Sequence, residues 1–189
     1  MKKEIRIIGI DDMPFSFNDS FTDIVGVVMR GGKYLEGVLK TTIEVDGKDA
    51  TDKIIDMIQA SGHRGQIKII MINGVALGGF NIVDCEKLFN ATDIPVITVA
   101  RKKPNIDKIE EALKKHFDDW RERIDLINKG RTEEIKLRYP IYIKYFGIGK
   151  KSAIDAIKLS IIRGAIPEPI RVAHLIATGI KKGESRGRC

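Results

Sequence analysis

Apolar residues in the first quarter of the chain fall into three runs of strand length. Residues 5–10 are mostly isoleucine, residues 22–29 form a second run, and residues 34–45 alternate between apolar and polar side chains. Runs rich in β-branched residues are typical of β-strands. Gly31-Gly32 separates the second run from the third, as in a tight hairpin. We therefore predict three consecutive antiparallel strands.

The pattern then changes to alternating helices and strands. An apolar stripe that begins after Asp49, the expected N-cap, predicts a helix that ends near Gly62. Continuous apolar runs over 66–72 and 94–100 predict buried parallel strands, and residues 80–90 between them predict a helix. The order β-β-β-α-β-α-β indicates an α/β fold. Its mixed sheet is antiparallel in the first three strands and then parallel, with helices on both faces.

The rest of the chain adds mainly helices. In chain order we predict a charge-dense helical region, a short aromatic strand and two further helices, over residues 105–128, 139–146, 151–163 and 167–182. No repeat or low-complexity linker divides the chain. We therefore expect a single domain over residues 1–189, with a basic C-terminal tail at about 183–189.

Composition narrows the possible partners. The formal net charge of +7 suits a polyanion such as nucleic acid, although Lys-rich and Glu-rich surfaces of proteins from hot environments explain the same value. No apolar stretch approaches the length of a membrane span, and the N-terminus has no signal-peptide layout. We therefore expect a cytoplasmic protein with no membrane partner. Cys85 and Cys189 form no ligand cluster, and we expect no disulfide between them.

The first strand ends in two carboxylates, Asp11 and Asp12. A buried, unpaired carboxylate is costly, and a metal ion is an economical partner for it. Acidic residues at strand ends also serve as simple turn-formers. Both interpretations stay open on these two residues alone.

Two other polar residues are expected near this strand end. Asn73 closes the predicted strand over 66–72, and His174 lies in the first turns of the last helix. Because the ends of neighbouring strands converge, Asp11, Asn73 and His174 form a candidate site for Mg²⁺ or Mn²⁺, with Asp12 as a further ligand. The alternative for His174 is a hydrogen-bonded histidine at the edge of the core. The glycine-rich residues 74–79 lack the Lys-Ser/Thr pair of a phosphate loop, which favours a tight turn.

Four blocks in the same order resemble the endonuclease dU family, a relative of endonuclease V with a ribonuclease H-like fold. The last block, Pro167-Glu168-Pro169-Ile170-Arg171-Val172-Ala173-His174, is long and specific. The other blocks are Gly9-Ile10-Asp11, residues 73–84 beginning Asn73-Gly74, and residues 94–101.

The resemblance implies a divalent-metal phosphodiesterase that cuts nucleic acid near a deaminated base. In the family pattern, metal-site residues correspond to Asp11, to the Asn73 position and to His174. Here an amide replaces the family's acid, which weakens metal binding and favours a catalytically weakened nucleic-acid-binding protein as the alternative. A protein that uses this crevice for protein contacts is a third class, which would not bind nucleic acid in a salt-dependent way.

Three further assignments are less direct. The family's glutamate has no clear match. Asp49 is chosen as the catalytic carboxylate over Asp46 and Asp52, although helix capping explains it equally. No residue carries the base-separating wedge of endonuclease V. Arg101-Lys102-Lys103 is predicted to hold the phosphate backbone of DNA or RNA, the alternative being a solvated loop. Within the last block, we expect an ion pair between Glu168 and Arg171.

Overall fold

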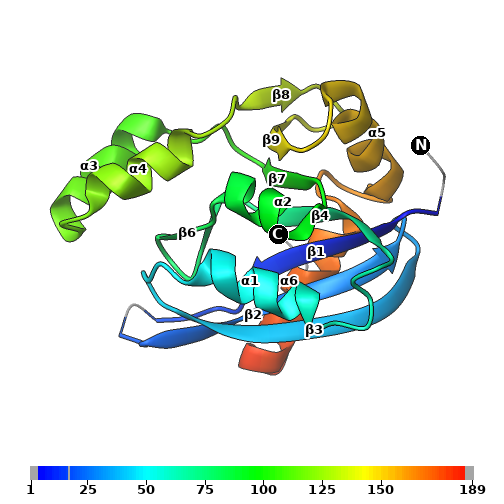
Figure 1. Ribbon diagram of the computed structural model, residues 1–189, viewed down its shortest axis with the longest axis horizontal. Helices are drawn as coiled ribbons and strands as arrows, with labels where there is room; N and C mark the ends of the chain where they lie inside the picture. Colours follow the sequence, from blue (N-terminus) through cyan, green and yellow to red (C-terminus); the bar gives the residue numbers. More distant parts are fainter. Residues whose placement is uncertain (1–3, 17, 186–189) are drawn as a thin grey trace.

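The computed structural model describes residues 4–16 and 18–185 and contains a seven-stranded sheet with helices on both faces (Figure 1). The strand order is β3-β2-β1-β4-β7-β9-β8. The sheet strands are β1 (Arg6–Asp12), β2 (Phe21–Arg30), β3 (Tyr34–Glu44), β4 (Ile67–Asn73), β7 (Val96–Ala100), β8 (Glu133–Ile135) and β9 (Ile141–Phe146). The helices are α1 (Ala50–Gln59), α2 (Cys85–Thr92), α3 (Ile106–His116), α4 (Trp120–Asn128), α5 (Lys150–Ser160) and α6 (Glu168–Lys182).

The pairing of the strands confirms the predicted mixed sheet. β1, β2 and β3 pair antiparallel, and β1, β4 and β7 run parallel. Both β9 and β8 add antiparallel at the far side of β7. The C-terminal ends of β1, β4 and β7 therefore meet along one edge of the sheet, which we call the carboxyl edge.

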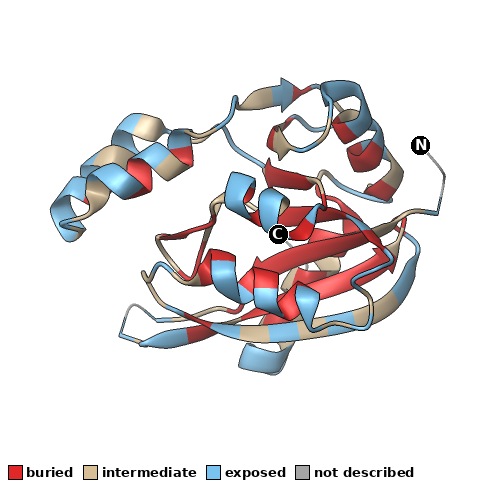
Figure 2. Ribbon diagram, viewed as in Figure 1, coloured by how far each residue is buried: buried red, intermediate tan, exposed pale blue. Residues whose placement is uncertain are grey.

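Each face of the sheet has its own core. Ile8 and Ile10 of β1 pack with α1 and α2 on one face, while Ile7, on the other face, packs with α5 and the start of α6. This alternation follows from the two-residue repeat of a strand, and it explains why the central strands are apolar without interruption. Figure 2 shows the resulting buried centre beneath the more exposed outer surfaces of the helices.

The predicted helix over residues 80–90 is wrong in its first half. Residues 76–82 form a short hairpin of β5 (Ala76–Leu77) and β6 (Asn81–Ile82), and α2 begins only at Cys85. Positive φ angles at Gly78 (53°) and Gly79 (89°) make this turn, as glycine allows.

The charge-dense region over residues 105–128 is two helices, α3 and α4, which form a hairpin that extends from the body (Figure 1). The chain is extended at Phe117, whose ring packs edge-on against Phe80 with centroids 5.6 Å apart. Leu113 and Ile124 bury the inner side of the hairpin. Aromatic packing outside the helix pattern thus divides a region that the sequence predicted only as helical.

No described helix is long and apolar enough to cross a membrane. Cys85 is buried, and burial raises the pKa of its thiol to about 12, so the thiolate is disfavoured at neutral pH. Cys189 and the last four residues of the predicted basic tail, 186–189, lie outside the described residues.

Candidate functional site

Asp11 lies at the carboxyl edge and is almost fully buried, with 2% of the residue exposed. Its Oδ1 accepts a hydrogen bond of 3.0 Å from Nδ2 of Asn73, and its Oδ2 lies 2.8 Å from Nδ1 of His174. Residues far apart in the sequence, on β1, β4 and α6, therefore meet at one carboxylate. The structure brings together all three residues of the predicted constellation.

A glycine explains how α6 comes this close to β1. A Cβ atom at Gly9 would lie 2.1 Å from the carbonyl carbon of Pro169, so only glycine lets the start of the helix cross the strand there. Asp11 lies two residues after Gly9 on β1, and this approach of α6 puts His174 beside it. The predicted ion pair between Glu168 and Arg171 is confirmed, with Arg171 Nε donating to Glu168 Oε1 at 2.9 Å.

Asp12 binds the neighbouring turn. Its Oδ2 accepts a hydrogen bond of 2.7 Å from the backbone N–H of Gly78. Burial and the nearby Asp11 carboxylate nevertheless raise the pKa of Asp12 to about 6. The hydrogen bond to Asp11 raises the pKa of His174, against the opposing effect of burial. The site thus concentrates negative charge that one imidazole compensates only in part.

The donor set fits a hard divalent cation. Carboxylate, carboxamide and imidazole groups are ligands of Mg²⁺ and Mn²⁺. Among the described residues, no group of three or more His, Cys, Asp and Glu side chains is arranged to hold an ion. Asn73 and water would therefore have to complete the coordination.

The three candidate second carboxylates lie in different settings. Asp49 occupies the N-cap position of α1 without a capping hydrogen bond, and its Oδ1 accepts from Nδ2 of Asn81 (2.7 Å) and from the backbone N–H of Glu44 (3.2 Å). Asp52 pairs with Lys87 at the surface. Asp46 accepts a 2.7 Å hydrogen bond from the backbone N–H of Phe80. The catalytic role of Asp49 remains a prediction.

The sequence alone did not reveal that Asp12 and Asp46 hold the same turn. Asp12 binds the backbone of Gly78, and Asp46 binds that of Phe80 and donates its own N–H to Gly78 O at 2.8 Å. The glycines at 78 and 79 were the only available signal. A turn held by the carboxylates of Asp12, at the end of β1, and Asp46, in the loop after β3, couples the site to the β5–β6 hairpin.

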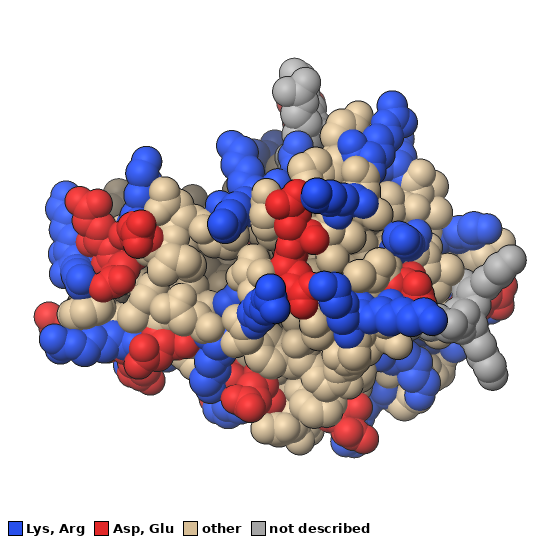
Figure 3. Space-filling view, turned by 90° about the horizontal axis from the view of Figure 1, so that it is seen from above, with Lys and Arg blue, Asp and Glu red and all other residues tan. Residues whose placement is uncertain are grey.

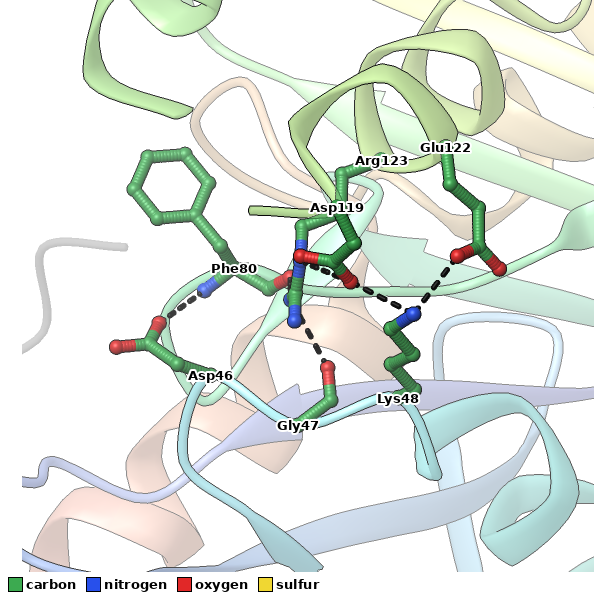
Figure 4. Close-up of polar contacts among 7 residues, drawn as sticks. All are labelled: Asp46, Gly47, Lys48, Phe80, Asp119, Glu122 and Arg123. Atoms are coloured by element: carbon green, nitrogen blue, oxygen red, sulfur yellow. Dashed lines mark hydrogen bonds and ion pairs between the residues drawn. The ribbon is translucent and has the colours of Figure 1, made fainter. Parts of the chain in front are cut away.

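A polar network joins this turn to the helical hairpin (Figure 4). Arg123 donates to the carbonyl oxygens of Gly47 (3.0 Å) and Phe80 (2.6 Å). Lys48 pairs with both Asp119 and Glu122 at 2.7 Å. Burial alone would raise the pKa of Asp119, but hydrogen bonds from Arg123 and Lys48 lower it to about 2. The α3–α4 hairpin is therefore anchored beside the candidate site.

A cavity of about 220 Å³ opens beside Gly74, the residue that follows Asn73. Its walls come from the β4–β5 connection, from β7 and β9, and from the helical hairpin; they include Gly74, Ala76, Phe80, Thr98, Ile109, Tyr142 and Lys144. Burial lowers the pKa of Lys144, which donates hydrogen bonds to the carbonyl oxygens of Ile127 and Lys129 at the end of α4. The cavity is mostly apolar, with few polar groups at its wall.

The predicted phosphate-binding residues Arg101, Lys102 and Lys103 are exposed just beyond the end of β7. Since Asn73 pairs with Val99, this segment leaves the sheet at the same carboxyl edge as Asp11. Lys and Arg side chains are interspersed with acidic ones on the face seen from above (Figure 3). That face presents no continuous basic surface, and the role of residues 101–103 remains a prediction.

Residues 3–181 match the family model described as endonuclease dU. The chain belongs to the endonuclease dU family. This family member is 47% identical over 189 residues to a UPF0215 protein of Methanothermobacter thermautotrophicus, covering 99% of this chain and 93% of the relative. A crystal structure from Archaeoglobus fulgidus is 40% identical with a TM-score of 0.84, covering 94% of this chain and 98% of that one.

The fold is also that of endonuclease V. The Ciona intestinalis endonuclease V, solved with DNA that contains an inosine, matches with a TM-score of 0.61 at 14% identity, covering 92% of this endonuclease dU chain and 84% of that chain. At this identity the match concerns the fold alone. It confirms the ribonuclease H-like fold that the sequence resemblance implied.

Proposed function

We propose that this protein is a divalent-metal-dependent endonuclease that hydrolyses phosphodiester bonds in DNA or RNA. One observation carries the proposal: the buried carboxylate of Asp11 contacts both Asn73 and His174 at the carboxyl edge, beside the carboxylate of Asp12. Family membership supports a nuclease. Asp11, Asp12, Asn73 and His174 are the residues that would hold Mg²⁺ or Mn²⁺.

The bound ion would supply Lewis-acid polarisation of the scissile phosphate and a water of lowered pKa. The protein's own residues orient the carboxylate that would bind the ion. Asn73 donates to one oxygen of Asp11 and fixes the carboxylate plane, while Nδ1 of His174 lies 2.8 Å from the other oxygen. In the neutral tautomer that carries its proton on Nδ1, His174 donates to Asp11 and leaves Nε2 free for the ion. Exposed Arg101, Lys102 and Lys103 would hold the flanking phosphates.

The preference for a deaminated base is part of the same proposal. A flat ring turned out of the strand can enter the cavity beside Gly74, where Tyr142 and Phe80 offer apolar contact. The inosine-containing DNA in the Ciona intestinalis complex makes hypoxanthine the first base to test. Uracil is the second, because it is also a product of deamination.

Cleavage of defined oligonucleotides tests the proposal. Single-stranded and duplex DNA and RNA, each with one uracil, one hypoxanthine or no altered base, are incubated with Mn²⁺ or Mg²⁺. We expect metal-dependent cuts near the altered base, abolished in Asp11→Ala. No cleavage by the wild type, or equal cleavage by Asp11→Ala, would refute the enzymatic role. Parallel Asp46→Asn and Asp49→Asn variants identify the second carboxylate, which we expect to be Asp49.

The second candidate is a catalytically weakened nucleic-acid-binding protein on the same fold. Asn73 favours it, because an amide contributes no negative charge to a cation. Calorimetric titration with Mn²⁺ separates the two functions. A nuclease should bind Mn²⁺ measurably, and Asn73→Asp should tighten that binding. A protein that binds oligonucleotides but no Mn²⁺, in either form, is the binding module.

A further inference from the structure

The turn between β8 and β9, residues 136–140, is exposed and carries two cations and an aromatic ring. Lys136, Arg138 and Tyr139 are all exposed, and the Tyr139 side chain is among the few large hydrophobic ones at the surface, at 48% exposure. The Arg138 guanidinium lies 5.6 Å from the centre of the Tyr139 ring. An exposed aromatic ring next to cations is suited to stacking on a base while the cations meet phosphates.

The register of the sheet places this turn at the carboxyl edge. Ala100, the last residue of β7, pairs with Tyr142 of β9, and Ile135 of β8 pairs with Ile141. The turn therefore emerges beside residues 101–103. From β1 to β9 there are three strand spacings of about 4.8 Å, so these two strands lie roughly 14 Å apart across the sheet, and the turn lies a few residues further out along the strand direction than Asp11. A few nucleotides of a single strand span that distance.

The cations at this edge are available to a ligand. In the described part of the chain, Lys102, Lys103, Lys136 and Arg138 form no ion pair. Lys150, by contrast, is paired with Glu133 at the other end of β8. Tyr142 and Thr98, on the strands next to the turn, line the 220 Å³ cavity together with Gly74.

We propose that the β8–β9 turn is a contact site for single-stranded nucleic acid, in which Tyr139 stacks on one base and Lys136 and Arg138 bind the adjoining phosphates. This inference rests on the proposed function in one respect only, which is that nucleic acid is the ligand. A single strand fits because its bases are free to stack on an exposed ring, whereas the bases of a duplex stack on one another. The strand would run along the carboxyl edge, from the turn past residues 101–103 to Asp11.

Binding without metal tests the turn separately from catalysis. Fluorescence anisotropy with labelled single-stranded oligothymidine and oligouridine is measured in EDTA, at several salt concentrations. Tyr139→Ala should weaken binding roughly tenfold, as expected for the loss of one stacked base, while Tyr139→Phe retains it. The double variant Lys136→Ala/Arg138→Ala should lower the slope of log K against log salt by about 1.4.

A matched double variant controls for general charge. Lys33→Ala/Lys158→Ala removes two exposed lysines near the β2–β3 hairpin, at the opposite end of the sheet, where Gly32 lies against Ser160. We expect its salt slope to stay close to that of the wild type. An equal fall in slope in this control would overturn the proposal, as would unchanged binding by Tyr139→Ala or an absence of binding by the wild type.

Binding to a duplex of the same sequence tests whether the turn requires a single strand. If Tyr139→Ala weakens duplex binding as much as single-strand binding, the single-strand assignment is wrong. The outcome also separates this proposal from the nuclease proposal. If oligonucleotides bind through Tyr139 in EDTA but are never cut with Mn²⁺, the contact site at the turn is supported and only the nuclease proposal fails. Cleavage with unchanged binding by Tyr139→Ala rejects the turn alone.

Discussion

The carboxylates at the two ends of β1 have opposite kinds of partner. At its start, Glu36 is held between Arg6 and Arg30, with Arg30 Nε donating to Glu36 Oε1 at 2.7 Å. Burial alone would raise the pKa of Glu36, but the hydrogen bonds from Arg30 and Arg6 keep it below its usual value. The negative charge of Glu36 is therefore already paired with two arginines of the protein.

At the other end, Asp11 and Asp12 have one histidine and neutral donors as partners. The pKa of Asp12 is raised to about 6 instead of lowered. A carboxylate paired with two arginines has no negative charge left to neutralise. A pair of carboxylates with one imidazole, in contrast, retains affinity for a cation. The difference distinguishes a structural ion cluster at the start of β1 from a candidate metal site at its end.

The largest expected effect comes from exchanging one acid for its amide at each end. Asp11→Asn should reduce metal-dependent cleavage to background, because the ion loses a charged ligand. The melting temperature should stay nearly unchanged, because the variant removes a buried charge that lies beside the carboxylate of Asp12. Glu36→Gln should lower the melting temperature and leave cleavage intact, because both arginines lose their partner. Cleavage assays and thermal denaturation of the two variants measure this, and a loss of cleavage in Glu36→Gln would break the comparison.

The pH dependence of stability should differ at the carboxyl edge. The pKa of Asp12 rises from 3.8 to about 6 on folding, so the folded protein binds this proton more tightly than the unfolded chain. The contribution of Asp12 to the free energy of unfolding should therefore fall by about 3 kcal/mol as the pH rises from about 4 to about 6. Asp12→Asn should remove this fall, so that it is more stable than the wild type near pH 7.

Urea unfolding of Asp12→Asn and wild type across that pH range gives the measurement. Added Mn²⁺ near pH 7 should stabilise the wild type more than Asp12→Asn, because a cation bound at the site replaces the missing proton. Parallel stability curves for the two proteins would show that folding does not raise the pKa of Asp12.

Gly9→Ala should weaken the approach of α6 to β1. The added Cβ would meet the backbone of Pro169 at 2.1 Å, and a forced shift of this kind costs about 1–3 kcal/mol. Cleavage should fall as well, because His174 moves away from Asp11. Gly62→Ala is the control, since a Cβ added there would meet no atom within 4 Å. Equal unfolding free energies for the two variants, from urea titration, would contradict the close approach.

The smallest expected effect is that of salt. At about 1 M salt the Debye length is roughly 3 Å, so the partly exposed pairs of Glu36 are screened. The difference in melting temperature between Glu36→Gln and wild type should narrow at high salt. The difference between Asp12→Asn and wild type should change less, because Asp12 is more deeply buried. A reversal of this order in thermal denaturation would weaken the contrast between the two ends.

Part of the fold and site could be predicted from local patterns. The isoleucine-rich strands were found because a buried strand has few alternatives to β-branched residues, and Asp11, Asn73 and His174 were found because each interrupts or ends an apolar pattern. The break at Phe117 and the β5–β6 hairpin were missed. Both depend on contacts with residues distant in sequence, such as Phe80 with Phe117 and Asn81 with Asp49.

The amino-acid sequence alone determined the mixed sheet, its two-sided core and the residue types at the carboxyl edge, since these follow from side-chain periodicity and from the cost of burying charge. Only the tertiary structure decided that Gly9 admits α6, that Asp12 holds the Gly78 turn, and that the β8–β9 turn emerges beside residues 101–103. These depend on the packing of segments distant in sequence, which no local pattern records.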